Sequence, residues 1–276
     1  MIPNHFIRVN ENQCTRCGLC VKVCRGTLAM EENGPVVVHD FCIACGHCTA
    51  ICPSGALDHA RAPLSNQILL EKSPLPDADT AARFLRSRRS VRSFQKKSVP
   101  RETIRELLDI ARFAPTACNS QGVSYHVIDD PATLREIAAV IADWAEEDLK
   151  KGALGRSPWS SNTANTIGRY RENGEDTILR DAPCLIVAVA EKSRLLLGRD
   201  NTHFALTYAQ LYASALSLGT CWSGLFEYCA AAEYEPLLRL IKIPVNKAVT
   251  GALIAGYPLY SFKRLVDRDP LEITWQ

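Results

Sequence analysis

The feature that most constrains this chain is a block of cysteines near its N-terminus. The chain has 276 residues and 12 cysteines, and eight of these fall between Cys14 and Cys52. They form two runs with the spacing C-x2-C-x2-C-x3-C, and each cysteine of the first run is matched 28 residues later. The segment is therefore a duplicated ligand loop, and its fold has to bring cysteine side chains together.

The spacing is typical of cysteines that bind iron–sulfur clusters. Three thiolates at intervals of three residues can hold three corners of a cubane, and the fourth, four residues further on, points to the other cluster. We therefore expect two [4Fe–4S] clusters that exchange their fourth ligands. The predicted ligands are Cys14, Cys17, Cys20 and Cys52 for one cluster and Cys42, Cys45, Cys48 and Cys24 for the other.

Two other uses of clustered cysteines fit less well. A disulfide framework requires an oxidising compartment, and the N-terminal residues show neither the basic nor the apolar region of an export signal. Zinc sites pair two ligands with two more across a spacer, often with histidine, and neither His39 nor His47 occupies a ligand position. The block resembles the bacterial two-cluster ferredoxins. We expect a ferredoxin-like domain over residues 1–60 of a cytoplasmic protein.

Composition and charge exclude other classes. The chain is 47% apolar and 22% charged with a net charge of +2, so it is globular and carries no overall basic field for nucleic acid. Residues 204–226 are uncharged and long enough to span a bilayer, but they contain several hydroxyl and amide side chains and a break at Gly219. We expect a buried helix over Phe204–Leu218 and no membrane association.

The rest of the chain predicts a larger mixed domain. Prolines without periodicity indicate a linker over residues 61–80, which leaves residues 81–276 for the second domain. Apolar runs predict strands at Tyr125–Ile128, Cys184–Ala190 and Val249–Gly256, and helical spacing follows Pro100 and Pro131. The polar residues 143–180 indicate an excursion over the surface, with a lid as one role.

A basic stretch opens the second domain. Arg88, Ser90 and Arg92 stand in an Arg-x-Ser-x-Arg pattern, which supplies bidentate and hydroxyl donors for a phosphate. A solvated helix face would have a similar composition, and a nucleic-acid site would need interleaved aromatic residues that are absent here. Neither a dinucleotide-binding glycine pattern nor a P-loop is present.

Five segments, in order, resemble motifs of the nitroreductase family of FMN flavoproteins. They are Arg88–Phe94 (RRSVRSF), Ala114–Gln121 (APTACNSQ), Leu218–Gly224 (LGTCWSG), Gly251–Pro258, which ends in GYP, and Arg268–Glu272 (RDPLE). The whole chain therefore looks like a ferredoxin fused to a nitroreductase domain. The resemblance implies an α+β fold: a small ferredoxin-like two-cluster domain followed by a nitroreductase-like α/β sandwich with a central mixed sheet.

The resemblance also implies which residues bind FMN. They are Arg88, Arg89, Ser90 and Arg92 around the phosphate, ribityl chain and ring, Asn119 and Gln121 at the ring, the backbone of Gly224, Leu225 and Phe226 near N5, and Arg268 with Lys263 or Arg264 at the phosphate. Asp269 interrupts the basic run expected at the last position. No catalytic side chain is implied, because the flavin supplies the redox chemistry.

The function implied is that of an iron–sulfur flavoprotein oxidoreductase. Electrons would pass from two [4Fe–4S] clusters to FMN and on to a small acceptor such as a nitroaromatic or a quinone. The donor would be a protein such as ferredoxin, or NAD(P)H, and the family's homodimers hold FMN at their interface. Two alternatives are a non-catalytic electron carrier or redox sensor with the same cofactors, and a zinc-bound scaffold without flavin.

Overall fold

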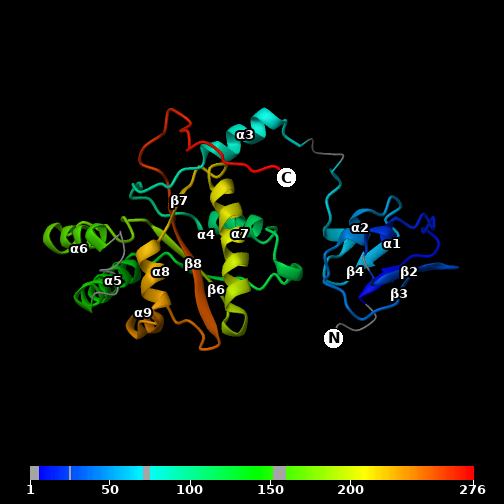
Figure 1. The fold of residues 1–276 in the computed structure, drawn as a ribbon, viewed down its shortest axis with the longest axis horizontal. Coiled ribbons are helices and arrows are strands. Elements are labelled where there is room, and N and C mark those ends of the chain that lie inside the picture. The colour runs from blue at the N-terminus through cyan, green and yellow to red at the C-terminus, as the bar shows by residue number, and fades with distance from the viewer. Residues whose placement is uncertain (1–5, 25, 71–74, 152–159) are drawn as a thin grey trace. The chain divides into compact units, whose positions relative to one another are not determined.

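The structure is a computed structural model that describes residues 6–24, 26–70, 75–151 and 160–276. The chain forms two compact units (Figure 1). The first contains the chain up to Pro76 together with Cys118–Ser120, and the second contains Asp77–Ala117 and Gln121–Gln276. Residues 71–74 of the predicted linker lie outside the described residues.

The N-terminal unit consists of short elements around a small core. Two antiparallel pairs are formed, β1 (Ile7–Val9) with β4 (Leu57–His59) and β2 (Leu28–Glu31) with β3 (Gly34–Val37). Two short helices, α1 (Leu19–Val23) and α2 (His47–Ala50), pack on each other, and a 3-10 turn, η1 (Leu64–Asn66), follows β4. Cys20 and Cys48 are buried with Phe6, Leu28 and Leu57, so the cysteines form part of the core itself.

The duplicated sequence produces a duplicated backbone. Gly18 and Gly46 precede α1 and α2 with the same left-handed conformation, φ 76° and ψ 0°. Two residues earlier, Arg16 and Ala44 have φ values of 57° and 54°. Because left-handed φ favours glycine, the two glycines allow the chain to turn sharply after the second cysteine of each run.

The C-terminal unit is built on a four-stranded sheet in the order β5-β6-β8-β7. The strands are β5 (Ser124–Ile128), β6 (Cys184–Glu191), β8 (Lys247–Gly256) and β7 (Gly219–Trp222), and neighbouring strands are antiparallel. A parallel bridge between Ser90 and Thr220 extends the sheet beyond β7 and makes it mixed. The predicted strands at β5, β6 and β8 are present, whereas β7 was not expected.

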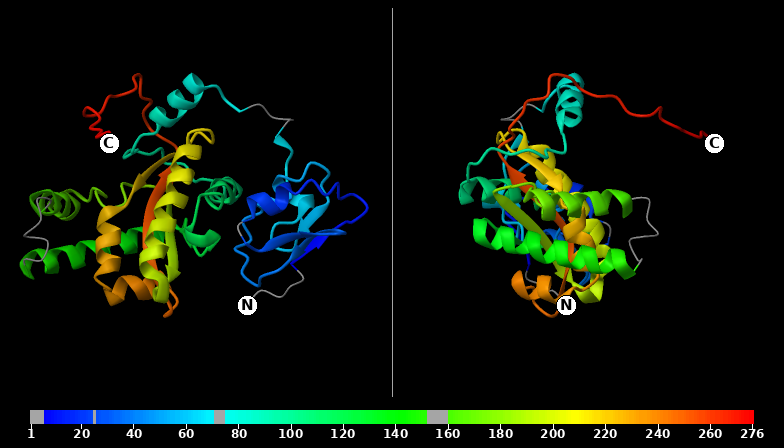
Figure 2. Two further views of the ribbon diagram at one scale, coloured as in Figure 1. Left: turned by 45° about the vertical axis from the view of Figure 1, so that its right-hand side comes forward. Right: turned by 90° about the vertical axis from the view of Figure 1, so that its left-hand side faces the viewer.

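Both faces of this sheet are covered, so its central strands are apolar on both sides. Residues Cys184, Ile186 and Ala188 of β6 pack in one core with α4 (Arg101–Ala111) and α7 (Leu195–Ala213). The alternate residues Leu185, Val187 and Val189 pack in a second core with α5 (Pro131–Lys151), α8 (Gly224–Ala231) and α9 (Glu235–Leu240). The unit is therefore a sheet between two helical layers (Figure 2).

Two expectations about helices need correction. The polar region 143–180 is largely helical, because α5 continues to Lys151 and α6 (Ser160–Asn173) packs against it. The intervening residues 152–159, which the expected lid includes, lie outside the described residues. Polar residues on the outer faces of α5 and α6 explain why periodicity gave no clear signal there.

The uncharged stretch 204–226 is not one helix. α7 ends at Ala213, and Leu218 N donates to Ala213 O (2.8 Å) after Ser217, which has φ 58°. The chain then enters β7 and α8, so the break comes before the expected Gly219. Among the residues described, no helix is both long and apolar enough to cross a membrane.

Candidate functional site

The eight N-terminal cysteines lie in two groups of four, each drawn from both runs. Cys14, Cys17, Cys20 and Cys52 line one small cavity. Cys24, Cys42, Cys45 and Cys48 form the other group, in which the side chains are close enough for their charges to interact. All eight are free thiols in the structure. Both groups follow from the packing of α1 on α2, because Cys24 comes directly after α1 and Cys52 comes two residues after the end of α2.

The environment of the cysteines favours neutral thiols unless a cation is present. Burial raises the pKa of Cys20 and of Cys42, and it raises the pKa of Cys48 to about 11. Neighbouring cysteine thiolates raise these pKa values further. A metal that replaces the protons would remove both penalties, because metal ligation requires the thiolate form.

Hydrogen-bond donors surround two of the sulfurs. Ala44 N donates to Cys42 Sγ (3.3 Å) and Ala56 N donates to Cys52 Sγ (3.3 Å). Burial opposes ionisation of Cys52, but hydrogen bonds from Ser54 and from backbone amides outweigh it and lower the pKa of this thiol. Negative charge on sulfur is thus already partly stabilised by the protein.

The described cysteines are not arranged as the ligands of a single metal ion. Within the described part of the chain, no three or more Cys, His, Asp or Glu side chains converge as the ligands of one ion would. The thiolates of a cubane each bind a different iron and so stand further apart than the ligands of one zinc ion. Gly34 passes beside the first group, where a β-carbon would lie 3.4 Å from Cys14 Sγ.

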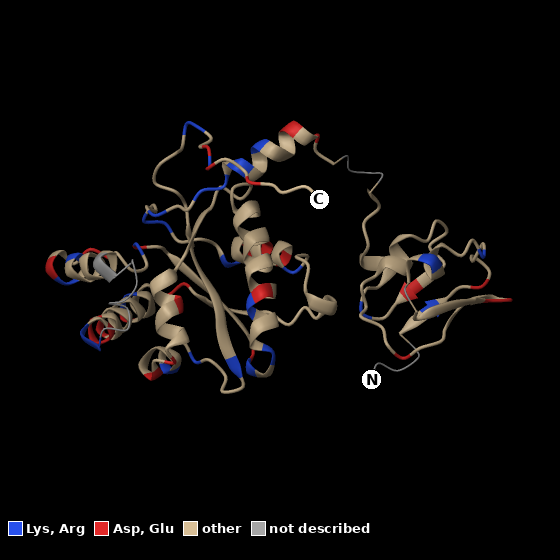
Figure 3. Cartoon of the chain, in the orientation of Figure 1, with Lys and Arg blue, Asp and Glu red and all other residues tan. Residues whose placement is uncertain are grey.

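In the C-terminal unit, the basic motif runs along the edge of the sheet. α3 (Ala78–Ser87) ends just before Arg88, and Val91 N then donates to Thr220 O (2.9 Å) on β7. This approach requires Gly219, because a β-carbon there would lie 2.5 Å from Val91 Cγ2. Lys and Arg residues are frequent along the segment between α3 and α4 (Figure 3).

A pocket of about 550 Å³ opens beside this motif. Arg88 and Arg89 line it together with Gln210 of α7 and the segment Tyr257–Phe262. The Arg89 guanidinium stacks over the Phe262 ring at 5.0 Å from its centre, which holds that side chain in place. Cations, a buried amide and aromatic rings thus meet in one cavity.

Two buried polar atoms in this unit have no hydrogen-bond partner among the described residues. They are Gln210 Oε1 and Ser223 Oγ. Gln210 is 5% exposed, and Ser223 lies just before α8. A buried acceptor without a donor costs about 1–3 kcal/mol. Gln210 Oε1 is therefore placed to accept a hydrogen bond from a ligand in the pocket that Gln210 lines.

Arg180 is a candidate that sequence reasoning missed. It is half-buried, has φ 61°, and makes no hydrogen bond or ion pair within the described residues. Burial lowers the pKa of its guanidinium, and the nearby cation of Arg92 lowers that pKa further. Two like charges close together favour binding of an anionic ligand. The local sequence around Arg180 could not indicate this role, because Arg180 and Arg92 come together only in the folded chain.

The start of α8 leaves its backbone donors free. Gly224, Leu225 and Phe226 form the first turn, whose amides have no intrahelical acceptor. No described atom lies within 4 Å of the position that a β-carbon of Gly224 would take, so the first turn faces open space at Gly224. Phe226 itself is buried and anchors the helix in the core.

Three further predicted residues, Asn119, Gln121 and Arg268, are not among the residues that line the basic pocket. Asn119 belongs to the N-terminal unit, where its amide donates to the carbonyls of Ile43 (3.0 Å) and Ala44 (2.8 Å). Gln121 N donates to Thr116 Oγ1 (3.1 Å). Arg268 is exposed, and its hydrogen bonds within the described chain run to the adjacent Asp267. It does not line the basic pocket.

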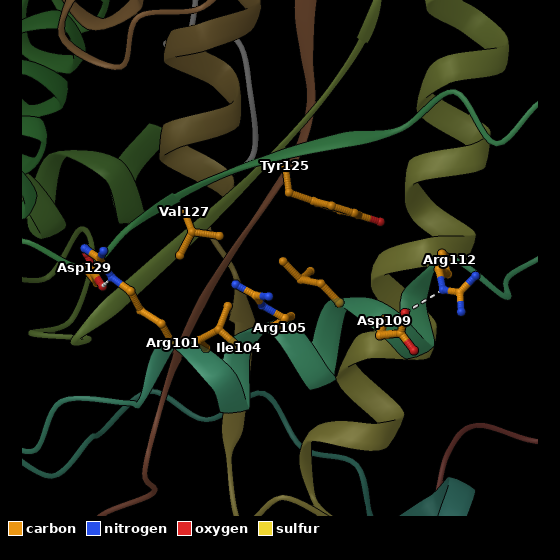
Figure 4. Close-up of a pocket in the computed structure, with 9 residues that line it drawn as sticks. Arg101, Ile104, Arg105, Asp109, Arg112, Tyr125, Val127 and Asp129 are labelled. Atoms are coloured by element: carbon orange, nitrogen blue, oxygen red, sulfur yellow. Dashed lines mark hydrogen bonds and ion pairs between the residues drawn. The ribbon is translucent and has the colours of Figure 1, made fainter.

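A larger hollow of about 640 Å³ lies apart from all predicted site residues. Its walls are α4 and the outer edge of β5, whose other edge pairs with β6 (Figure 4). Tyr125 and Val127 face Ile104 across it, and Arg101, Arg105 and Arg112 stand at its margin. Its apolar walls lie beside an edge of β5 that pairs with no other described strand, and such an edge can pair with another chain segment.

Comparison with known proteins assigns both parts of the chain. The nitroreductase family matches residues 85–257, and a 4Fe-4S dicluster domain matches residues 6–53. A protein of Thermus thermophilus named NADH dehydrogenase is 44% identical over 195 residues, which cover 67% of this chain and 88% of that protein. Ferredoxin-3 of Rhodobacter capsulatus is 29% identical over 84 residues, which cover 21% of this chain and 83% of that ferredoxin.

Solved structures agree on the fold of the larger unit. A nitroreductase with bound FMN from Bacteroides fragilis aligns over 70% of this chain and 97% of its own, with a TM-score of 0.55 and 19% identity. The predicted fold class and the predicted fusion are thereby confirmed. The chain belongs to the nitroreductase family, and it is an oxidoreductase of that type with an N-terminal 4Fe-4S dicluster domain.

Proposed function

We propose that this protein is an iron–sulfur flavoprotein that passes electrons from two [4Fe–4S] clusters to FMN and on to a small acceptor. The observation that carries the proposal is a basic pocket with an unpartnered buried acceptor, in a chain that also gathers eight free cysteines into two groups. The paired arginines suit a phosphate, and the cysteine groups suit iron–sulfur clusters.

Each group of cysteines would hold one cluster. The first set is Cys14, Cys17, Cys20 and Cys52, and the second is Cys42, Cys45, Cys48 and Cys24. Support comes from their grouping and from the mutual repulsion of their neighbouring thiolates, which the iron cations of a bound cluster would offset.

FMN would lie in the basic pocket beside the opening motif. Arg88 and Arg89 would bind the phosphate dianion, with Ser90 as a hydroxyl donor, and Gln210 Oε1 would accept a hydrogen bond from the ribityl chain or ring. FMN supplies one- and two-electron chemistry when bound. The free amides of Gly224, Leu225 and Phe226 would donate to it from the first turn of α8.

Arg92 and Arg180 would act together toward the ring. Burial is the main reason that the pKa of Arg180 is lowered, and repulsion by the Arg92 cation adds to it, so a nearby negative charge would relieve both effects. The pair would therefore stabilise the anionic form of the reduced cofactor and raise its potential. No side chain is required as a general acid in this scheme.

The donor and acceptor are proposed by chemical class. The relative named NADH dehydrogenase supports a nicotinamide donor, and the fused dicluster domain supports a low-potential protein donor such as ferredoxin. Nitroaromatics and quinones suit the acceptor position, because both are planar and take up electrons from a flavin without a covalent partner on the protein.

A homodimer is the proposed assembly, with FMN at its interface. The segment after Pro258 is rich in exposed apolar side chains, among them Leu271 and Trp275, which is 86% exposed. The unpaired edge of β5 and its apolar hollow offer a surface of matching chemistry on a second copy (Figure 4). Acidic residues Asp267, Asp269 and Glu272 in the tail complement the arginines at the margin of the hollow.

The flavin site is tested by removing its phosphate donors. A protein with both Arg88→Ala and Ser90→Ala should be purified with little or no FMN, because two donors to the dianion are lost. Arg86→Ala is the matched control, since Arg86 is an exposed residue of α3 that does not line the pocket. Normal flavin content in the double variant would contradict the assignment.

The electron path is tested at a cluster ligand. Cys17→Ala should lose turnover driven by reduced ferredoxin while it keeps its FMN, because Cys17 lies in the N-terminal unit. Full turnover with the ferredoxin donor would contradict transfer through the clusters.

A further inference from the structure

The environments of the two cysteine groups differ at one buried histidine, His59. This residue is the last of β4 and is 1% exposed. Its Nε2 lies 3.7 Å from Cys42 Sγ, within the range of a hydrogen bond to sulfur. The Phe6 ring packs against the imidazole with 5.3 Å between ring centres, so the imidazole is held in position.

The backbone determines which nitrogen carries the proton. Arg61 N donates to His59 Nδ1 (3.0 Å), so Nδ1 must present a lone pair. In a neutral imidazole the proton then resides on Nε2, the nitrogen that faces Cys42. A cysteine that binds iron is a thiolate, which can only accept, and His59 Nε2–H is therefore the donor.

Because the ligand loop is duplicated, the environments of equivalent cysteines can be compared within the same chain. Cys14 is the counterpart of Cys42, 28 residues earlier, and no side chain among the described residues donates to its sulfur. The position that corresponds to His59 is Glu31, which is exposed. The main chain of Gly34 fills the space beside Cys14 instead. The duplication therefore preserves the ligands and changes one donor.

We propose that His59 raises the reduction potential of the cluster held by Cys42, Cys45, Cys48 and Cys24, and so makes the two clusters inequivalent. The inference rests on the proposed iron–sulfur sites. Reduction adds one electron to the cluster and spreads negative charge onto its sulfurs, and no bond is formed or broken. An N–H···S hydrogen bond stabilises that added charge, more strongly in a buried site than in water.

The effect acts through Cys42, so His59 is a positioning residue and not a ligand. Its consequence is an order of reduction, in which the cluster near His59 accepts an electron first. The other group has a more exposed counterpart in Ser54, whose hydroxyl lies 3.7 Å from Cys52 Sγ. Because Ser54 is less buried than His59, we expect its effect on the potential to be the smaller of the two.

The test is a potentiometric titration of the full-length holoprotein followed by EPR. His59→Leu removes the donor, and His59→Gln retains an amide N–H in the same region. In His59→Leu one of the two midpoint potentials should fall by about 59 mV, which corresponds to a tenfold change in the oxidised-to-reduced ratio of a one-electron couple. His59→Gln should recover part of this shift, and Ser54→Ala should lower the other potential.

Different results would exclude the role of His59 and the presence of the clusters themselves. Wild-type protein without iron and sulfide would remove the proposed clusters. Two potentials that stay unchanged in an iron-replete His59→Leu protein would overturn only the role of His59.

A second measurement uses the wild-type protein, so it does not depend on whether a variant at His59 folds. Pulsed EPR of reduced wild-type protein labelled with ¹⁵N-histidine should show a nitrogen coupling on one of the two cluster signals. Absence of any histidine coupling would overturn the proposal even if His59→Leu failed to assemble its cluster.

Discussion

The contact between Gly219 and Val91 links the basic motif to the sheet, and it can be broken with a single methyl group. In Gly219→Ala the new β-carbon would meet Val91 Cγ2 at 2.5 Å, Cβ at 2.7 Å and Cγ1 at 2.9 Å. Val91 cannot yield easily, because its β-branched side chain is stiff and its amide is tied to Thr220 O (2.9 Å). We expect a loss of about 2–3 kcal/mol in the free energy of unfolding of the C-terminal unit.

The origin of this loss is tested by a double-mutant cycle. Val91→Ala alone should cost about 1.6 kcal/mol, because it removes two buried methyl groups. Combined with Gly219→Ala it also removes the clash, so the double variant should be less destabilised than the sum of the single variants by about 1–2 kcal/mol. Gly168→Ala on α6 is the control, since the nearest described atom to its β-carbon would lie 3.9 Å away.

Urea unfolding followed by tryptophan fluorescence measures these changes in one unit. All four tryptophans lie beyond residue 77, so the signal reports on the C-terminal unit. Gly219→Ala should also weaken FMN binding, because it displaces Ser90 and its neighbours from β7. An unchanged unfolding midpoint in Gly219→Ala, or strictly additive costs in the cycle, would refute the argument from close approach.

Three further predictions concern the site and the assembly. Arg180→Leu should lower the two-electron potential of the flavin by about 30 mV, a tenfold effect, and an unchanged potential would exclude Arg180 from the site. Burial raises the pKa of Glu227 above 4.5, so the stability that this group contributes is lost as pH rises from 4.5 through the raised pKa. Glu227→Gln keeps the acceptor for Ala252 N (2.8 Å) without the charge, and should unfold at higher urea than wild type at neutral pH but not near pH 4.5. Removal of residues 263–276 should weaken dimerisation in sedimentation velocity, and an unchanged association constant would contradict a role for the tail.

The sequence was most informative where spacing alone determines chemistry. The spacing of the cysteine runs predicted the two groups of four cysteines directly. A duplicated loop repeats its backbone conformation, as the matching φ values of Gly18 and Gly46 illustrate. The buried strands β5, β6 and β8 were also predictable, since each is a compact apolar run between breakers. β7 was missed because its four residues show neither alternation nor length.

The rest of the site depends on contacts between distant segments. Arg180 comes near Arg92 only through the fold, and His59 reaches Cys42 because β4 pairs with β1. Gln210 appeared in the sequence as one polar residue in an uncharged helix, and only its burial beside the pocket makes it a candidate. Single polar residues of this kind carry no periodic signal, so a sequence cannot rank them.

One chain should carry both cofactor types, and the cofactor stoichiometry of the purified protein measures this most directly. Iron, acid-labile sulfide and flavin should be assayed on one anaerobic sample together with its absorption spectrum. We expect about eight irons, about eight sulfides and one FMN for each chain. Zinc without flavin would contradict both sites, and iron without flavin would contradict the proposed FMN pocket beside Arg88.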